Sequence, residues 1–413
     1  MRSYSDIFTG KIDELHANGN YRYFLNVHKN ARTFPEFIYE KNGAKRQAIN
    51  FCSNDYLGMS VNADVFPTIT STIVESGLGS GGTRNISGTT NHHLALEGTI
   101  SKWHKKEAAL LFGSAYLANL TTLQTIGRHI PDLVFISDER NHASLIEGMR
   151  SAGNKKFIFS HNDLNHLSSI LQSIPVDQPK LIVFESMYSM NGTISPVKQI
   201  LELAKKYNAL TYVDEVHAIG LYGVTGAGIL EREGLQEEAD IINGTFAKSL
   251  GVVGGYIAAS DQIVDFIRSY GSGFIFTTSL PPFICAAVNT NINIIQNNRT
   301  LSDHVFQLVK YLRCLLDEAK ITYAHNPSHI TPLIISDAKE CRKVANILLE
   351  KYGVYVQPVN YPTVPVGEEC LRIILTARHT QSHVHHLLKS LKAVFHEKSK
   401  NYLPKQQAQL IAG

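Results

Sequence analysis

The chain is short of the residues that mark several classes of protein. Only five of its 413 residues are cysteines, they stand far apart, and they include no C-x-x-C pair: Cys52, Cys285, Cys314, Cys341 and Cys370. An odd number of isolated cysteines predicts neither a disulfide framework nor a metal cluster. It suits a reducing compartment, and we therefore expect a cytoplasmic protein.

Charge and long apolar runs are scarce as well. Charged residues make up 18% of the sequence, and 39 Lys and Arg against 36 Asp and Glu leave a net charge of +3. No basic block predicts a nucleic-acid partner. No apolar run approaches the roughly 18 residues of a membrane-spanning helix, and residues 1–6 (MRSYSD) do not begin a secretory signal. We expect no nucleic acid and no membrane among the partners.

What the sequence does contain is an alternation of apolar runs and amphipathic stretches. Hydrophobic residues make up 44% of the chain. The stretches at 163–174 and 196–207 have helical periodicity, and the apolar runs lie at 108–112, 133–136, 181–184, 210–213 and 240–243. Runs without polar alternation suit strands that are covered on both faces. Strands that alternate with helices predict an α/β fold with a mostly parallel, doubly wound sheet.

The pattern changes along the chain and predicts a division into domains. Residues 1–50 are polar and aromatic-rich and suggest an N-terminal arm, and residues 51–295 contain the α/β pattern. After residue 296 come a helical pattern at 301–319, short strands at 330–335, 354–359 and 371–375, and a helix at 381–395. We expect residues 296–400 to form a smaller C-terminal α+β domain and residues 401–413 to form a tail.

Several of the predicted strands end on polar residues. Ser137 follows the run at 133–136, Glu185 follows 181–184, and Asp214 follows 210–213. Because ligands of parallel sheets bind beyond the carboxyl ends of the strands, these side chains predict a ligand site. The G-x-G-x-x-G match at 77–82 does not predict a dinucleotide site, because it follows a helical stretch at 66–76 and no acidic residue lies about 20 positions on. We expect no metal.

The polar groups meet the demands of pyridoxal phosphate (PLP). This cofactor needs a lysine, an acid against its ring nitrogen, a phosphate cradle and a flat group over its ring. Lys248 lies among small residues before a glycine-rich segment, and Asp214 ends a predicted strand. Ser114 begins a predicted helix directly after a strand, and His142 follows another strand end. The four groups together predict a PLP site.

Each of these residues also has an ordinary explanation. Lys248 taken alone suits a surface lysine, because most lysines are exposed. Asp214 and Ser114 suit helix caps. His217, three residues after Asp214, suits a hydrogen-bonded core histidine. What favours the PLP site is that all the required groups occur together and in order.

Longer motifs carry a resemblance to a known family. They are residues 52–58 (CSNDYLG), 79–90 (GSGGTRNISGTT), 137–143 (SDERNHA), 184–190 (FESMYSM), 240–248 (DIINGTFAK), 273–282 (GFIFTTSLPP) and 357–365 (QPVNYPTVP). Over about residues 20–395 the chain resembles the α-oxoamine synthases, fold-type I PLP-dependent transferases that join an amino acid to an acyl-CoA. The last two motifs resemble the branch that condenses glycine with succinyl-CoA, giving 5-aminolevulinate, coenzyme A and CO₂ for tetrapyrrole and haem biosynthesis.

The resemblance implies roles for individual residues around the cofactor. Lys248 would carry PLP covalently and later remove an α-proton of glycine, and Asp214 would pair with the ring nitrogen. His142 would stack on the ring, and His217 would lie near its phenolic oxygen and help to protonate the thioester carbonyl. The remaining cofactor contacts would come from Ser114, Ala115, Tyr116, Ser189, Thr245 and, from the other subunit of a homodimer, Thr277 and Thr278.

The resemblance also implies how the two substrates bind. Asn54 and Arg372 would bind the glycine carboxylate, near which Ser189 also lies, and Ser137 and Lys156 would contact coenzyme A. The succinyl end would be surrounded by Arg22, Thr83, Asn85, Ile86 and Thr363. Arg22 would supply the cation that a second carboxylate needs. Thr83 would crowd a β-carbon and so favour glycine over alanine.

Several alternatives stay open. Arg22 also suits a solvated surface arginine, and Lys155 and Lys156 also suit a bare surface doublet. Glycine C-acetyltransferase and 8-amino-7-oxononanoate synthase are α-oxoamine synthases with other substrates, although Arg22 and Thr83 argue against them. A catalytically silent protein that acts only by binding partners is the alternative from another class, and the intact lysine, aspartate and histidine set argues against it.

Overall fold

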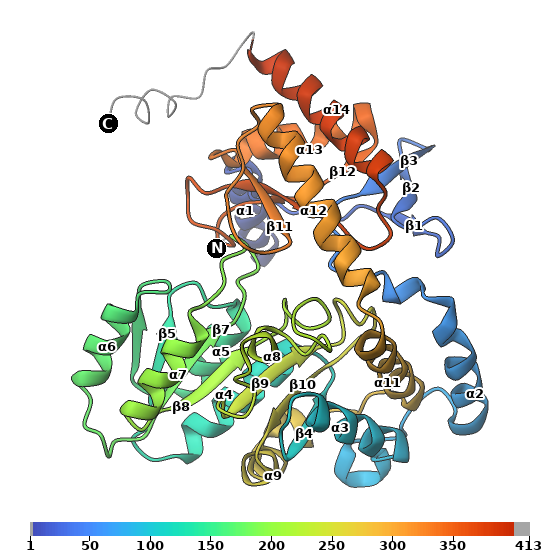
Figure 1. Ribbon diagram of the computed structural model, residues 1–413. Coiled ribbons are helices and arrows are strands. Elements are labelled where there is room, and N and C mark those ends of the chain that lie inside the picture. Colours follow the sequence, from blue (N-terminus) through green and yellow to red (C-terminus); the bar gives the residue numbers. More distant parts are fainter. Residues whose placement is uncertain (1–2, 400–413) are drawn as a thin grey trace. The chain divides into compact units, whose positions relative to one another are not determined.

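The computed structural model describes residues 3–399, in two compact units (Figure 1). The central unit comprises Asn54–Asp303, and the terminal unit combines the residues up to Ser53 with those from His304 onward. The predicted domain boundaries at 50, 295 and 400 stay predictions, and the predicted tail at 401–413 lies outside the described residues. No helix among the described residues is long and apolar enough to cross a membrane.

A seven-stranded sheet forms the middle of the central unit. The strand order is β4 (Ala108–Phe112), β10 (Gly255–Ala259), β9 (Ile241–Thr245), β8 (Leu210–Asp214), β7 (Lys180–Glu185), β5 (Val134–Asp138) and β6 (Lys156–Phe159). β10 runs antiparallel to both of its neighbours, and every other pair is parallel. The prediction of an α/β fold with a mostly parallel sheet is therefore confirmed.

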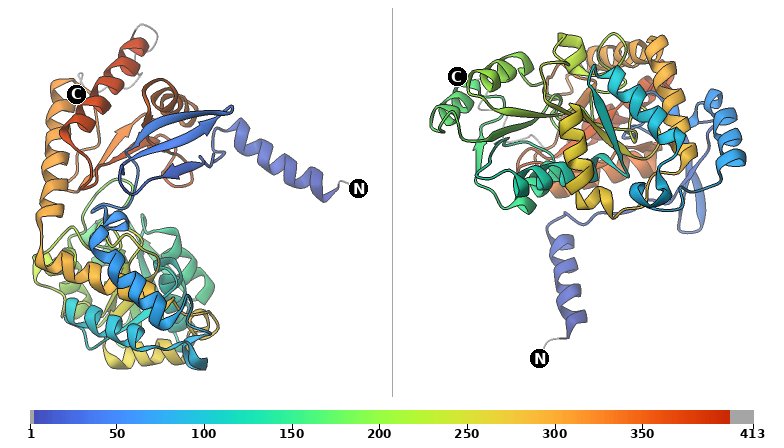
Figure 2. Two further views of the ribbon diagram at one scale, coloured as in Figure 1. Left: turned by 90° about the vertical axis from the view of Figure 1, so that its right-hand side faces the viewer. Right: turned by 90° about the horizontal axis from the view of Figure 1, so that it is seen from below.

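Helices cover both faces of this sheet, which explains why its strands lack polar alternation (Figures 1 and 2). Leu181 and Val183 belong to a core that also contains residues of α4 (Ala115–His129), α5 (Ala143–Ala152) and α9 (Asp261–Tyr270). Ile182 and Phe184 alternate with them and are equally buried. On the second face lie α6 (Leu164–Gln172) and α7 (Val197–Lys206) (Figure 1).

The remaining helices of the central unit are α2 (Phe66–Ser76), α3 (Asn91–Trp103), α8 (Ile229–Glu233), α10 (Ser272–Ile275) and α11 (Pro282–Asn297), with short turns of helix η1 (Met59–Val61), η2 (Ala63–Val65) and η3 (Arg84–Gly88). α2 occupies the stretch that was predicted to be helical before the G-x-G-x-x-G match. Because a helix and not a strand precedes those glycines, they do not have the structural context of a dinucleotide site.

Two smaller sheets form the terminal unit. One has the order β1 (Val27–Lys29), β2 (Glu36–Lys41), β3 (Ala44–Asn50), β12 (Val354–Tyr355), and the other has the order β11 (Ile330–Ile334), β14 (Cys370–Ile374), β13 (Pro358–Val359). Its helices are α1 (Tyr4–Ala17), α13 (Ala338–Tyr352), α14 (Gln381–Ser399) and, from His304 on, the greater part of α12 (Thr300–Glu318). Residues 1–50 show no strong periodicity, and their described part, residues 3–50, contains one helix and three strands.

One predicted strand is corrected by the structure. The stretch 354–359 forms two short strands in different sheets, with β12 parallel to β3 and β13 antiparallel to β14. Pro358 begins the second of them. Proline has no N–H to donate to a sheet, so it is found at the start or the edge of a strand and breaks what would otherwise read as one run.

Candidate active site

A cavity of about 170 Å³ lies at the carboxyl ends of β7, β8 and β9 in the central unit. It is lined by Ser114, Ala115, Tyr116, Asn119, His142, Ser144, Glu185, Asp214, Val216, His217, Thr245 and Lys248. Every cofactor residue predicted from the sequence lines it except Ser189, Thr277 and Thr278. Residues from five separate segments therefore meet where a parallel sheet is expected to bind its ligand.

The amino-terminal end of α4 forms one wall of the cavity. Ser114 caps this helix, and its Oγ accepts a hydrogen bond from the Leu117 backbone N–H at 3.1 Å. The first N–H groups of a helix and its dipole attract anions, so this end suits a phosphate. β10 passes directly behind it, because a Cβ on Gly255 would lie 2.2 Å from the Ala115 backbone nitrogen.

Asp214 is the buried acid of the cavity. Its Oδ2 accepts a hydrogen bond from the Asn119 Nδ2 at 2.8 Å, and its Oδ1 accepts one from the Val216 N–H at 2.9 Å. Burial raises the pKa of Asp214, and the hydrogen bonds from Asn119 and Val216 work against that rise. A buried carboxylate in a fixed orientation is suited to pair with a cationic ring nitrogen.

Asn119 is a residue that the sequence reasoning missed. Its Oδ1 accepts a hydrogen bond from the Tyr212 hydroxyl at 2.7 Å, and its Nδ2 also donates to the Ser144 Oγ at 2.9 Å. It thereby fixes the orientation of Asp214. Helical spacing could have indicated Asn119, because it lies one turn beyond Ala115 and so faces the same side of α4.

Glu185 is a second buried acid, directly opposite Asp214 in the pairing of β7 with β8. Its Oε1 accepts a hydrogen bond from the His142 N–H at 2.7 Å. Burial raises the pKa of Glu185 well above its usual range, and the neighbouring Asp214 raises it further. The polar strand end predicted at this position is therefore part of the cavity, although no role was predicted for it.

His142 presents its ring beside this pair of acids. It caps α5, and its Nδ1 accepts a hydrogen bond from the Ser144 N–H at 3.2 Å. Its ring meets Tyr116 edge-on, with 6.3 Å between the centroids. Burial lowers the pKa of His142, and Asp214 opposes that effect. A neutral, flat imidazole is a suitable group to lie over an aromatic cofactor.

His217 is held by a residue that was not predicted as part of the site. The Tyr56 hydroxyl lies 2.7 Å from the His217 Nδ1, and the Tyr56 side chain is fully buried. The same hydroxyl lies 3.3 Å from the Oδ1 of Asn54, which is itself exposed. Tyr56 therefore orients the His217 ring through its Nδ1.

Lys248 lies in the loop between β9 and β10. The Gly251 N–H donates to the Lys248 carbonyl at 2.8 Å, and the Ala247 N–H donates to the Thr245 Oγ1 at 3.1 Å, so the loop has a defined shape. Burial is the main cause of both pKa shifts; the positive charge of Lys248 opposes the rise in the pKa of Asp214 and adds to the fall in the pKa of His142. One cavity thus holds an amine, a buried acid, a flat ring and a helix end, the set of groups that PLP needs.

Other predicted residues of the central unit lie outside this cavity. Ser189 is buried in the turn after β7. Ser137 is buried within β5, where its Oγ accepts a hydrogen bond from the Asn141 Nδ2 at 2.9 Å. Lys156 is exposed at the start of β6. Thr83 pairs with Thr278 in an isolated β-bridge.

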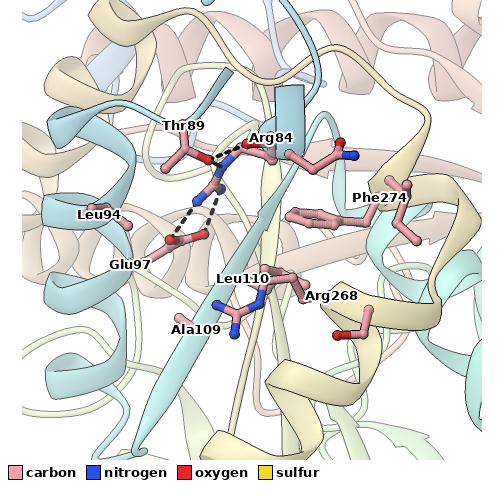
Figure 3. A pocket seen from close by; sticks show the side chains of 11 residues that line it. Arg84, Thr89, Leu94, Glu97, Ala109, Leu110, Arg268 and Phe274 are labelled. Carbon is pink, nitrogen blue, oxygen red and sulfur yellow. Dashed lines mark hydrogen bonds and ion pairs between the residues drawn. The ribbon is translucent and has the colours of Figure 1, made fainter. Parts of the chain in front are cut away.

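Asn85 lines a second and larger cavity, of about 440 Å³ (Figure 3). The Arg84 guanidinium makes a two-pronged ion pair with Glu97, at 2.7 and 2.9 Å, and its Nε donates to the Thr89 Oγ1 at 3.0 Å. The Thr83 Oγ1 donates to the Asn85 Oδ1 at 2.7 Å. No lysine is among the described residues that line this cavity, so the smaller one is the better candidate for PLP chemistry.

The terminal unit holds the other predicted substrate residues. Arg22 and Thr363 line a cavity of about 130 Å³ together with Asn20, Arg342, Pro358, Val359, Asn360 and Tyr361. Arg372 is buried in β14. The structure therefore brings two of the residues predicted for the succinyl end together, from opposite ends of the chain.

Comparison with known proteins agrees with this fold and cavity. The family model of Aminotransferase class I and II matches residues 46–391. The mostly parallel sheet and the cavity with its lysine agree with this class. A serine palmitoyltransferase from S. paucimobilis, solved with a bound PLP–myriocin aldimine, superposes with a TM-score of 0.86 at 27% identity and covers 95% of this chain and 98% of that one.

Two curated relatives define the family more narrowly. The 5-aminolevulinate synthase of Bradyrhizobium diazoefficiens is 42% identical over 409 residues, 99% of each chain. That of Rickettsia bellii is 46% identical over 396 residues, 96% of this chain and 94% of the relative. The chain belongs to the 5-aminolevulinate synthase family.

Proposed function

We propose that this chain is a PLP-dependent acyltransferase that condenses glycine with succinyl-CoA and releases 5-aminolevulinate, coenzyme A and CO₂. The product is a precursor of tetrapyrroles and haem. The observation that carries the proposal is the meeting of Lys248, Asp214 and His142 in one cavity. The family to which the chain belongs identifies the reaction and its two substrates.

Each group of the cavity has a place in this chemistry. When bound, PLP supplies an electron sink for the negative charge that develops on the α-carbon of glycine. Asp214 would stabilise a positive charge on the ring nitrogen, and the amino-terminal end of α4 would hold the phosphate with Ser114, Ala115, Tyr116 and Thr245. His142 would cover the ring.

Lys248 has two tasks in succession. Its Nζ would hold the cofactor covalently, and the same amine, once free, would take a proton from the α-carbon of glycine. His217, held through its Nδ1 by Tyr56, donates a hydrogen bond or a proton toward the thioester carbonyl. Both steps need groups whose positions are fixed before the substrates arrive, and Tyr56 provides that for His217.

The substrates carry carboxylates, and arginines are the side chains that bind these with two parallel hydrogen bonds. We assign Arg372 to the carboxylate of glycine, and Arg22 with Thr363 to the distal carboxylate of succinyl-CoA. Asn54 and Ser189 are further glycine contacts, and Ser137 and Lys156 are coenzyme A contacts. These assignments follow from the resemblance of the chain to the family.

The active form that we propose is a homodimer in which Thr277 and Thr278 of each chain serve the site of the other. The β-bridge between Thr83 and Thr278, with the hydrogen bonds from the Ser279 Oγ to the carbonyls of Gly82 and Gly88 at 3.0 and 2.6 Å, supports an extension of this proposal. Because these segments form one cluster, we assign Thr83, Asn85 and Ile86 to the same site as Thr277 and Thr278, which is the site of the other chain.

We place the protein in the cytoplasm, a location supported by the fact that all five cysteines are free. A homodimer with shared sites is tested by mixing chains. Lys248→Ala and Thr278→Ala chains, each weakly active alone, should recover activity when they are unfolded and refolded together, because some mixed dimers contain one intact site. Failure to recover activity in dimers of verified mixed composition contradicts shared sites.

Identification of the product is the direct test of the reaction. The purified protein with PLP, glycine and succinyl-CoA is expected to form 5-aminolevulinate, identified by mass spectrometry, and to form little ketone product from acetyl-CoA or octanoyl-CoA. A preference for acetyl-CoA or octanoyl-CoA points to another α-oxoamine synthase and overturns the assignment. Borohydride reduction followed by peptide mapping should place the cofactor on Lys248. A protein that forms no product and carries no cofactor after incubation with PLP would support the alternative of a binding protein.

A further inference from the structure

The segment that carries Arg22 is held against α13 by one arginine. The Arg342 Nη2 donates a hydrogen bond to the Tyr21 carbonyl at 2.6 Å, and the Arg342 guanidinium lies over the Tyr23 ring, 5.0 Å from its centroid. Arg342 therefore grips the residue on each side of Arg22. Arg22 itself is exposed and lines the cavity of about 130 Å³, which Arg342 lines as well.

The Tyr23 ring that Arg342 contacts belongs to a series of three aromatic rings in contact. Tyr23 meets Tyr21 edge-on at 5.0 Å, and Tyr21 stacks on His16 at 3.9 Å with 18° between the planes. The Tyr21 N–H also donates to the Leu15 carbonyl at 3.1 Å. The three rings and the guanidinium thus run from the end of α1 to α13, and each layer limits the motion of the next.

The backbone just before Arg22 is also confined. Gly19 has a φ of +73°, which other residues adopt only with strain, and a Cβ there would lie 3.0 Å from the Lys339 Cγ of α13. The Asn360 Nδ2 lies 3.4 Å from the Gly19 carbonyl. In contrast, no residue of α1 is buried. The contacts of Gly19, Tyr21 and Tyr23 therefore hold the backbone that carries Arg22.

We infer that Arg342 is a positioning residue that orients Arg22 toward the distal carboxylate of the acyl substrate. The inference rests on the proposed function and adds a residue to it. A long arginine on an unsupported arm has to lose backbone and side-chain freedom each time it binds a carboxylate. Arg342 removes much of that freedom beforehand, so it strengthens substrate binding without taking part in the reaction.

Arg342→Ala tests this through a separation of KM from kcat. We expect the KM for succinyl-CoA to rise about tenfold, in line with the loss of a charge-assisted hydrogen bond and an aromatic contact. The kcat and the KM for glycine should stay within about twofold, because the groups that react are not touched. Lys343→Ala, an exposed lysine next to Arg342 on α13, is the matched control and should leave all three values unchanged.

A double-mutant cycle distinguishes positioning from a general structural role. Arg22→Ala should raise the KM for succinyl-CoA by itself, and adding Arg342→Ala to it should change the KM by less than about twofold, because Arg342 then has nothing left to orient. Tyr23→Leu should reproduce the part of the rise in KM that comes from the aromatic contact, and Tyr23→Phe, which keeps the ring, should have the wild-type KM. Tyr23 is 57% exposed, so its variants should fold even if Arg342→Ala does not.

Three results would overturn the inference. They are an unchanged KM for succinyl-CoA in Arg342→Ala, an equal rise in KM with and without Arg22, and a fall in kcat that accompanies the change in KM. These outcomes differ from a failure of the proposed function, in which the wild-type protein itself forms no 5-aminolevulinate from glycine and succinyl-CoA.

Discussion

The two cavities that carry the proposed function are built in different ways. In the central unit, Asp214 and Glu185 end neighbouring strands, and hydrogen bonds that are buried or part-buried fix the acids and the histidines beside them. In the terminal unit, Arg22 is exposed on an arm that is fixed by stacked rings and by Arg342. The groups assigned to chemistry thus depend on the sheet, whereas the group assigned to recognition depends on side-chain contacts.

This difference predicts how substitutions in each cavity affect the protein. A buried acid such as Asp214 has its pKa raised by burial and needs all of its partners, so the loss of one is expected to be costly. Contacts at an exposed arm contribute less each, because water competes for the same groups. We therefore expect substitutions in the central cavity to reduce kcat, and those in the terminal cavity to raise the KM for succinyl-CoA.

Lys248→Ala should have the largest effect. The kcat is expected to fall at least roughly 10³-fold, because no other described residue that lines the cavity carries an amine to bind the cofactor covalently and take the α-proton. Steady-state formation of 5-aminolevulinate measures it, with Lys205→Ala, an exposed lysine of α7, as the control. Turnover close to that of the wild type would refute the assignment of the central cavity.

Asp214→Asn should rank second. The side chain keeps its size but loses its negative charge, so a cationic ring nitrogen is no longer stabilised, and kcat should fall about 10²-fold or more. Cofactor affinity, followed by titration of the absorbance of bound PLP, should weaken as well. A kcat within tenfold of the wild type would mean that another group balances the ring nitrogen.

Arg22→Ala should have a smaller effect and one of a different kind. The KM for succinyl-CoA is expected to rise roughly 10- to 100-fold, which corresponds to about 1.5–3 kcal/mol for hydrogen bonds to a charged group. The kcat should change little. If kcat were to fall as much as in Asp214→Asn, the distinction between a cavity for chemistry and a cavity for recognition would be lost.

Acidification should lower the free energy of unfolding through both units by similar amounts, an effect smaller than those of the substitutions above. Burial lowers the pKa of His104 in the central unit and of His379 in the terminal unit to about 3, from 6.5. The unfolded chain then binds more protons than the folded chain between these values, so the stabilisation present above pH 6.5 is lost as the pH falls. Each histidine contributes up to about 1.4 kcal/mol per pH unit.

Urea unfolding at pH 7.5 and at pH 5.5 measures this loss. Other groups titrate too; burial raises the pKa of Glu215 to about 7, for example, and that contributes with the opposite sign. The comparison is therefore made between the wild type and His104→Gln or His379→Gln, each of which should flatten the dependence on pH. An unchanged dependence in His379→Gln alone would show that the terminal unit does not take part.

The same contrast explains what could be predicted from the sequence. The buried strands gave the clearest signal, as at 108–112, which is β4, because strands covered on both faces are continuously apolar. The polar residues at their ends, Asp214 among them, then followed from the rule for parallel sheets. Asn119 could have been found by helical spacing, whereas Tyr56 could not, because its partner His217 is 161 residues away.

The terminal unit was less predictable for a physical reason. Its first strands are partly exposed, and in β3 only one residue is buried, so residues 44–50 carry little hydrophobic pattern. The hydrogen bond between Arg342 and Tyr21 joins residues 321 positions apart, and no local pattern announces such a contact. The sequence therefore indicated Arg22 through the resemblance of its motifs, but not the residue that holds it.

The lack of a side chain at Gly255 has a large consequence. Gly255 leaves just enough space for the amino-terminal end of α4, and a methyl group there would meet both the nitrogen and the α-carbon of Ala115, at 2.2 and 2.5 Å. The same helix carries Ser114 at its cap and Asn119 one turn further on. An alanine at this strand position would displace the phosphate cradle and the partner of Asp214 together, and so silence the site without altering any group that reacts.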